Sequence, residues 1–185
     1  VYDIEEKYNG KFIGEKVEFY YEKEPHSNNG HKIIYMKETQ NSFFEADFED
    51  IENLNGEKLE YYAKSGKLTG INISPNALTL ENGVKTTVPK TGYNFGVYGS
   101  IKTVDNNSDG RADVVLISSA KLGRVKSVSD EKIYFSNKSA FNIDINEYET
   151  VKLFNAEGNE VLTGDIKKDD IAEIYAAADK SYAEI

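Results

Sequence analysis

Cysteine and tryptophan are both missing from this sequence of 185 residues, and methionine occurs once. Without cysteine the chain can form no disulfide, no thiolate metal site and no cysteine nucleophile. Proline occurs three times. No apolar run approaches the roughly 18 residues that a membrane-spanning helix needs. We therefore expect no membrane insertion.

Positive charge is scarce relative to negative charge. The chain has 22 lysines and arginines against 32 aspartates and glutamates, a formal net charge of −10. A chain this acidic repels phosphate backbones, so we expect no nucleic-acid partner. An acidic surface attracts cations instead and keeps abundant surface proteins apart.

Apolar and aromatic residues are present in the amounts that a folded core needs. Hydrophobic residues make up 39%, with 13 tyrosines and 9 phenylalanines, and these aromatics favour strands. Short strand-like runs recur along the chain, which predicts an all-β, mainly antiparallel fold with little helix. The runs are 16–21, 32–36, 58–62, 68–73, 77–80, 100–104, 114–117, 123–128, 132–135, 150–154 and 161–166.

A stretch rich in glycine and proline, 86–99, divides these runs and is the best candidate for a linker or crossover. We expect two small barrel-like or sandwich-like subdomains, 1–88 and 89–185. The segment 169–178 has two interpretations. Ile171, Ile174, Tyr175 and Ala178 fit a helical stripe, but the same residues could form a strand that turns at Asp179.

The most specific pattern is an acidic loop between two strand-like runs. Asp105, Asn107, Asp109 and Asp113 occupy positions 1, 3, 5 and 9, and Gly110 occupies position 6. Calcium binds six to eight oxygens, and short acidic side chains on alternate residues can converge on one point. The carbonyl of Arg111 at position 7 would be a backbone ligand. The pattern predicts a calcium site of Asp105, Asn107, Asp109, Arg111 and Asp113.

The loop has an alternative interpretation as an acidic turn that binds no ion, because Asp, Asn and Gly are ordinary turn residues. An EF-hand is excluded, since position 12 is Leu116 and both flanks are strand-like. A calcium ion bound by this nine-residue loop would fix the conformation of the loop. We expect a dissociation constant for calcium on the order of 10⁻⁴ to 10⁻³ M.

Tyrosines occur in adjacent pairs, Tyr20 with Tyr21 and Tyr61 with Tyr62, and Tyr35 lies in another run. They could form a sugar-stacking face. Neighbouring rings on a strand point to opposite faces, so we expect at least one ring of each pair in the core. No phosphate-binding loop or nucleophile elbow stands in a suitable context, so we expect no enzyme.

Three stretches together resemble the region outside the S-layer homology (SLH) repeats in clostridial cell-surface proteins. These stretches are 12–21, 99–115 and 165–171. The resemblance implies a secreted, cell-wall-associated, β-rich module of a Gram-positive protein, and it favours a strand near Asp170 and Ile171. The sequence begins within a polar segment and stops within a strand-like one, so we also expect a fragment of a longer protein.

The resulting expectation is a non-catalytic structural or spacer module of an extracellular surface protein, stabilised by calcium. Its partners would be the cell wall or neighbouring surface-protein domains. Two alternatives remain open: a carbohydrate-binding module that uses a tyrosine face, and an accessory domain of a cell-wall hydrolase.

Overall fold

The chain folds almost entirely into strands. The computed structural model describes residues 2–4, 12–23, 31–129, 132–136 and 142–185. Among these residues the only helices are three short 3-10 turns, η2 (Phe48–Asp50), η3 (Ile145–Glu147) and η4 (Thr163–Asp165). The expected all-β class is confirmed, and most strand pairs are antiparallel, as expected.

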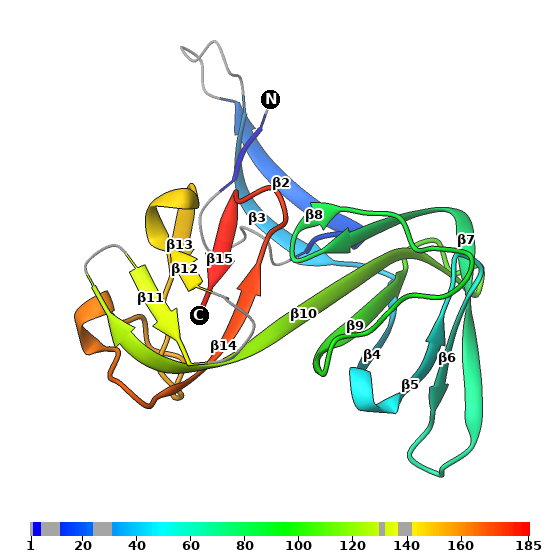
Figure 1. The fold of residues 1–185 in the computed structure, drawn as a ribbon. Coiled ribbons are helices and arrows are strands. Elements are labelled where there is room, and N and C mark those ends of the chain that lie inside the picture. The colour runs from blue at the N-terminus through cyan, green and yellow to red at the C-terminus, as the bar shows by residue number, and fades with distance from the viewer. Residues whose placement is uncertain (1, 5–11, 24–30, 130–131, 137–141) are drawn as a thin grey trace.

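One strand organises the molecule. β10 (Arg111–Val128) runs for 18 residues and joins the expected runs 114–117 and 123–128 into one strand. Figure 1 shows it crossing the whole molecule from one unit to the other. Gly123 lies in this strand against the ring of Phe135, where a Cβ atom would come within 2.3 Å of a ring carbon. The glycine therefore permits close packing here and does not end the strand.

The first unit is a curved sheet in the order β5, β6, β7, β10, β9, β4. Its strands are β4 (Ser42–Asp47), β5 (Ile51–Leu54), β6 (Lys58–Tyr62), β7 (Leu68–Glu81), β8 (Val84–Lys85) and β9 (Tyr98–Asp105). β6 and β7 form the expected hairpin. β7 also includes the expected run 77–80, because the chain stays extended through Pro75. A bulge shifts the register of β7 against β10 in this region. The β7–β10 pair is parallel.

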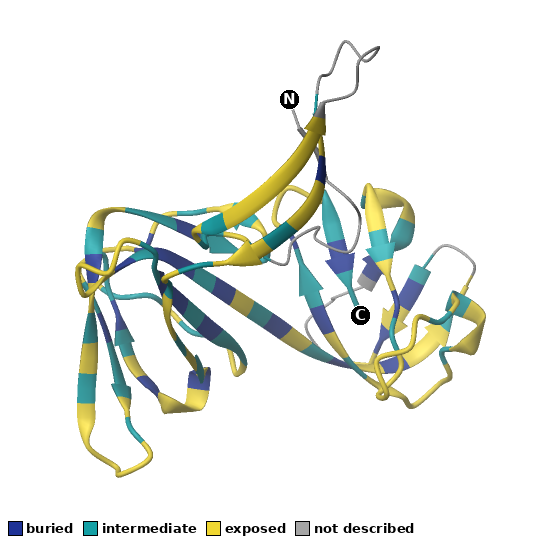
Figure 2. Cartoon of the chain, turned by 180° about the vertical axis from the view of Figure 1, so that it is seen from behind, coloured by how far each residue is buried: buried dark blue, intermediate teal, exposed yellow. Residues whose placement is uncertain are grey.

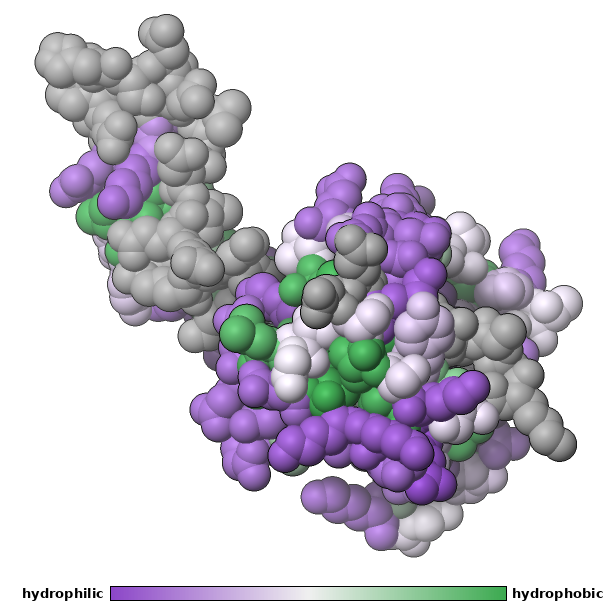
Figure 3. Space-filling view, turned by 60° about the vertical axis from the view of Figure 1, so that its left-hand side comes forward, coloured by the Kyte–Doolittle hydropathy of each residue, from purple (hydrophilic) through white to green (hydrophobic). Residues whose placement is uncertain are grey.

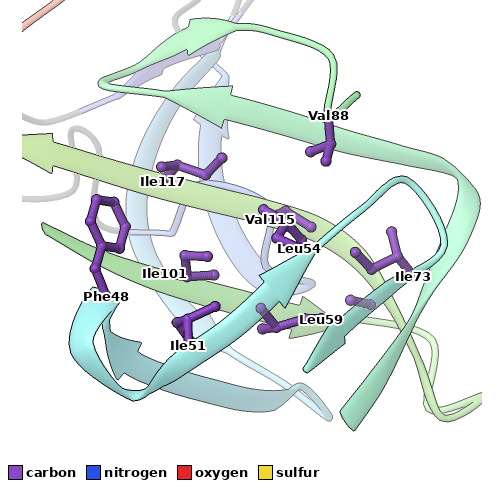
Figure 4. Packing of buried hydrophobic residues seen from close by; sticks show 10 residues of the cluster. Phe48, Ile51, Leu54, Leu59, Ile73, Val88, Ile101, Val115 and Ile117 are labelled. Atoms are coloured by element: carbon purple, nitrogen blue, oxygen red, sulfur yellow. The ribbon is translucent and has the colours of Figure 1, made fainter. Parts of the chain in front are cut away.

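The sheet of the first unit curls around a hydrophobic core, shown in Figure 4. Leu54, Leu59, Ile101 and Val115 are fully buried there. Val88 belongs to the same cluster, and Tyr93 and Phe95 pack against it. The stretch 86–99 is thus a crossover that covers the core, and the boundary expected between residues 88 and 89 falls inside this cluster.

The second unit surrounds a separate core. Its strands are β11 (Lys132–Phe135), β12 (Asn142–Asp144), β13 (Thr150–Lys152), β14 (Ile171–Ala176) and β15 (Tyr182–Glu184), together with the end of β10. Val125, Ile133, Ile143 and Ile174 fill this core. The strand interpretation of segment 169–178 is confirmed. The strand expected over 161–166 is wrong, because this segment is irregular and contains η4.

A three-stranded sheet projects from the first unit. It comprises β1 (Tyr2–Ile4), β2 (Val17–Lys23) and β3 (His31–Glu38) in the order β1, β3, β2. The expected hairpin of 16–21 with 32–36 is confirmed as β2 and β3, whereas most of the loop between them, 24–30, lies outside the described residues. Figure 2 shows that this hairpin is mostly exposed.

None of the helices in the described part of the chain is long and apolar enough to cross a membrane.

Candidate calcium loop and exposed surfaces

The predicted calcium loop connects the end of β9 to the start of β10. Val104 and Val114 are cross-strand partners, so the loop is the tip of an antiparallel hairpin. Asp105 is the last residue of β9 and Arg111 the first of β10. Ser108 and Gly110 both adopt positive φ, at 63° and 82°. The sequence assigned the sharp turn to Gly110, and the positive φ there agrees with that role.

Asp105 closes the loop through its carboxylate. Its Oδ1 accepts the backbone N–H groups of Asn107 at 3.3 Å and Ser108 at 2.6 Å, and its Oδ2 accepts that of Gly110 at 2.9 Å. A short acidic side chain at the start of a turn satisfies otherwise unpaired backbone donors in this way. The first predicted ligand is therefore also the main structural acceptor of the loop.

The remaining predicted side-chain ligands continue this network. Asn107 Oδ1 accepts the N–H of Asp109 at 2.9 Å, and Asp109 Oδ1 accepts the N–H of Arg111 at 2.9 Å. Asp113 closes the far end: its Oδ2 accepts the N–H of Asn106 at 3.1 Å, and its Oδ1 accepts the side-chain amide of Asn107 at 3.2 Å. All five predicted residues lie in one hydrogen-bonded turn.

These oxygens have the chemistry that calcium requires, since they are hard carboxylate and amide acceptors, and each offers more than one lone pair. Within the described chain, however, no group of three or more His, Asp or Glu side chains is gathered as metal ligands. In the structure Asp105, Asn107 and Asp109 accept backbone N–H groups of the loop. Calcium ligation by these residues stays a prediction.

Contacts that the spacing pattern did not predict fix the loop to the rest of the fold. Asn106, a residue outside the proposed ligand set, donates its side-chain amide to the carbonyl of Gly14 at 3.0 Å. Next to it, Lys102 Nζ lies 2.7 Å from Glu15 Oε1, and the Glu15 side chain is only 4% exposed. The segment that leads into β2 thus packs against the base of the loop. No local sequence signal marks these contacts, which join residues about 90 positions apart.

The tyrosines that could bind sugar are divided by the fold. Tyr61 packs against the first core and stacks on Phe44 at a centroid distance of 3.9 Å. Tyr20 and Tyr35 are cross-strand partners on the projecting hairpin, with 57% and 47% exposure and rings 6.0 Å apart. Tyr21 is also half exposed. The expectation of one core ring in each adjacent pair is wrong for Tyr20 and Tyr21, because at least half of each residue is exposed.

The second unit has a hollow of about 590 Å³ beside β14. Most of its wall is apolar, with Leu122, Val125, Leu153, Phe154 and Ile171 among the lining residues. Its volume lies in the range of ligand-binding sites in proteins. Figure 3 shows hydrophobic surface gathered near the middle of one side of the molecule, with hydrophilic side chains around it.

Comparisons with protein-family models, curated proteins and solved structures found no match to this chain. The fold and the geometry of these surfaces are therefore the basis for a functional assignment.

Proposed function

We propose that this chain is a non-catalytic structural or spacer module of a secreted bacterial cell-surface protein, of the type that carries SLH repeats. The observation that supports a structural role is the continuity of β10. Its side chains enter both cores, with Val115 and Ile117 in the first and Val125 in the second. A strand shared by two cores transmits load between them without a flexible joint. This is the property that a spacer needs.

In this proposal the β9–β10 loop binds calcium through Asp105, Asn107, Asp109, Arg111 and Asp113. The ion would replace part of the hydrogen-bonded network and fix the register of the hairpin. The expected gain in stability at millimolar calcium is about 1–2 kcal/mol, because the expected affinity is modest. The ion has a structural role and performs no chemistry.

The cellular location of the protein is a direct test of the proposal. Antibodies raised against the chain should label intact cells of the producing organism, and the protein should fractionate with the cell wall. Labelling that requires lysis of the cells would overturn the assignment to the surface. Deletion of the module from its parent protein should change the spacing or mechanical strength of the surface layer without loss of an enzymatic activity.

A carbohydrate-binding module is the second candidate, and the exposed pair of Tyr20 and Tyr35 favours it. Aromatic faces stack on sugar rings, and oppositely charged side chains flank this pair: Glu18 forms an ion pair of 2.7 Å with Lys37 on the same hairpin. The two rings are tilted by 48°, and the hairpin is a projecting ribbon. The pair therefore offers a small contact and not a continuous platform.

A pull-down with purified wall polysaccharide separates the two candidates. Retention that is lost in the double variant Tyr20→Ala and Tyr35→Ala would support sugar binding. The matched control replaces Tyr98 and Tyr134, which are also exposed but lie elsewhere. Equal retention of both double variants, or no retention of the unmodified protein, would count against the tyrosine face.

A further inference from the structure

Two strands pair in succession with the same flank of β10 where the two units meet. Ile117 of β10 pairs with both β7 and β9, and Ala120 pairs with both β9 and β14, so β7 and β14 share the flank opposite β9. On this flank β7 pairs with β10 as far as Ile117, and β14 begins at Ala120. Ser119 lies between these positions, and its backbone groups need other hydrogen-bond partners.

The side chain of Asn82 fills this gap in the sheet. The backbone N–H of Asn82 donates to the carbonyl of Ile117 at 2.9 Å. Its Oδ1 accepts the N–H of Ser119 at 2.9 Å, and its Nδ2 donates to the carbonyls of Ser119 at 2.9 Å and Ala176 at 3.1 Å. One amide side chain thus continues the β7 ladder along β10 and also holds the end of β14, so it joins the first unit to the second.

The turn that carries Asn82 does not by itself require asparagine. Asn82 and Gly83 are the two central residues of the β7–β8 hairpin, and both adopt positive φ, at 46° and 83°. Asp-Gly suits a turn of this kind as well as Asn-Gly does. A carboxylate, however, has no N–H to donate. The bonds that Asn82 donates to Ser119 and Ala176 therefore distinguish asparagine from aspartate at this position.

Asn82 and Gly83 also form a dipeptide in which asparagine readily loses its amide. The backbone nitrogen of Gly83 attacks Cγ of Asn82, ammonia leaves, and water opens the resulting cyclic imide to aspartate or isoaspartate. Gly83 is exposed, and nothing lies within 4 Å of its Cβ position, so the approach to this nitrogen is open. We expect the bonds to Ser119 and Ala176 to slow the reaction, because they restrict rotation of the amide.

We propose that Asn82 is a deamidation site and that its conversion to aspartate loosens the joint between the two units. The carboxylate loses the bonds to the carbonyls of Ser119 and Ala176, and its negative charge then faces these oxygens. β10 still connects the units but has less support on this flank. The change is permanent because the amide is not restored. The inference is independent of the proposed cell-surface role, since it rests on contacts within this chain.

Distances between spin labels test the loosening in the 185-residue chain. Because the chain has no cysteine, Lys64→Cys in the first unit and Glu157→Cys in the second place one label on an exposed turn of each. We expect a narrow distance distribution while Asn82 is retained and one about twofold wider for Asn82→Asp. Asn82→Gly keeps the turn without adding a charge, and it should widen the distribution as well.

Asn55→Asp is the matched control. Asn55 also precedes a glycine, but its Oδ1 accepts the backbone N–H groups of Glu57 and Lys58, both at 2.9 Å, and a carboxylate can do the same. This variant should keep the narrow distribution, and circular dichroism confirms that the variants fold. The proposal is overturned by a narrow distribution in either Asn82 variant, by equal widening in Asn55→Asp, or by a broad distribution while Asn82 is retained.

Mass spectrometry of peptides follows the deamidation itself in mildly alkaline buffer. We expect Asn82 to react about tenfold more slowly in the folded chain than in urea, because the reaction needs a local opening of the joint. Protein deamidated at Asn82 is separated by its added charge and should show the wider distribution, which keeps the test valid if a variant fails to fold. No conversion of Asn82 in the folded chain, equal rates with and without urea, or a narrow distribution after conversion would overturn the proposal.

Discussion

The carboxylate of Asp105 accepts the backbone N–H of Gly110 at 2.9 Å and so draws the two ends of the β9–β10 turn together. The same carboxylate accepts the N–H of Ser108. The turn is thus held by its own hydrogen bonds. We expect the hairpin to keep its shape without calcium, and an ion that replaces part of this network to add only a modest further stabilisation.

Glu15 and Lys102 are expected to stabilise the attachment of the projecting hairpin. Replacement of Glu15 by glutamine leaves Lys102 without its buried partner, and we expect the free energy of unfolding to fall by about 1–3 kcal/mol, below the cost of a fully buried pair because Lys102 is partly exposed. Urea denaturation measures this loss. The control is Glu18→Gln, whose ion pair with Lys37 is half exposed on both sides, and we expect it to lower the free energy of unfolding by clearly less than Glu15→Gln does. Equal losses would contradict the anchoring role.

Gly99 is expected to tolerate no side chain. A Cβ atom there would come within 2.2 Å of the carbonyl oxygen of Ser118 and within 2.5 Å of the ring of Phe48, and φ is 147°. Gly99→Ala should therefore lower stability by about 3 kcal/mol or more, because β9 must move from β10 or Phe48 must leave the core. Thermal denaturation gives the measurement.

Gly66→Ala is the comparison for this prediction. Gly66 also has positive φ, at 75°, but nothing lies within 4 Å of its Cβ position. Its replacement should cost only the backbone strain of about 1 kcal/mol. A Gly99 variant as stable as the Gly66 variant would show that β9 and β10 are less closely packed than the structure indicates.

Tyr93 should make stability fall at alkaline pH. Burial, followed by the hydrogen bond of 2.6 Å that Tyr93 donates to Glu81, raises the pKa of this tyrosine above its ordinary value of 10.0. Its stabilising contribution is complete below pH 10 and is lost as pH rises further, because the unfolded chain then releases the proton first. Tyr93→Phe should therefore show a shallower decline of unfolding free energy between about pH 10 and pH 11.5. Equal slopes in the two proteins would contradict this assignment.

Alternation of apolar and polar residues predicted most of the fold. The hairpins of β2 with β3 and of β6 with β7 follow from runs of period two separated by turn residues. The pattern could not predict that β10 is one strand, because the two expected runs 114–117 and 123–128 are separated along the chain, and the packing of Phe135 on Gly123 depends on the fold. It could not predict the parallel pairing of β7 with β10 either, since that contact depends on distant parts of the chain.

The sequence predicted where the acidic β9–β10 loop lies, but it could not tell whether the side chains of that loop bind calcium or accept backbone hydrogen bonds. Short acidic residues at alternate positions serve both as calcium ligands and as acceptors for backbone donors in a turn. In the structure Asp105 and Asp109 have the second role. The exposure of Tyr20 and Tyr21 also escaped prediction, because alternation tells which residues share a face but not whether another layer covers that face.

The most direct test of the calcium-stabilised module is thermal unfolding in calcium and in chelator. The account predicts that about 5 mM calcium raises the stability of the unmodified protein by about 1–2 kcal/mol and that Asp109→Ala abolishes this increase. Asp179→Ala, which removes a comparable turn acceptor of the N–H of Ser181 at 3.0 Å, should keep the response to calcium. Coincident midpoints in calcium and chelator for the unmodified protein and for Asp109→Ala would contradict the account.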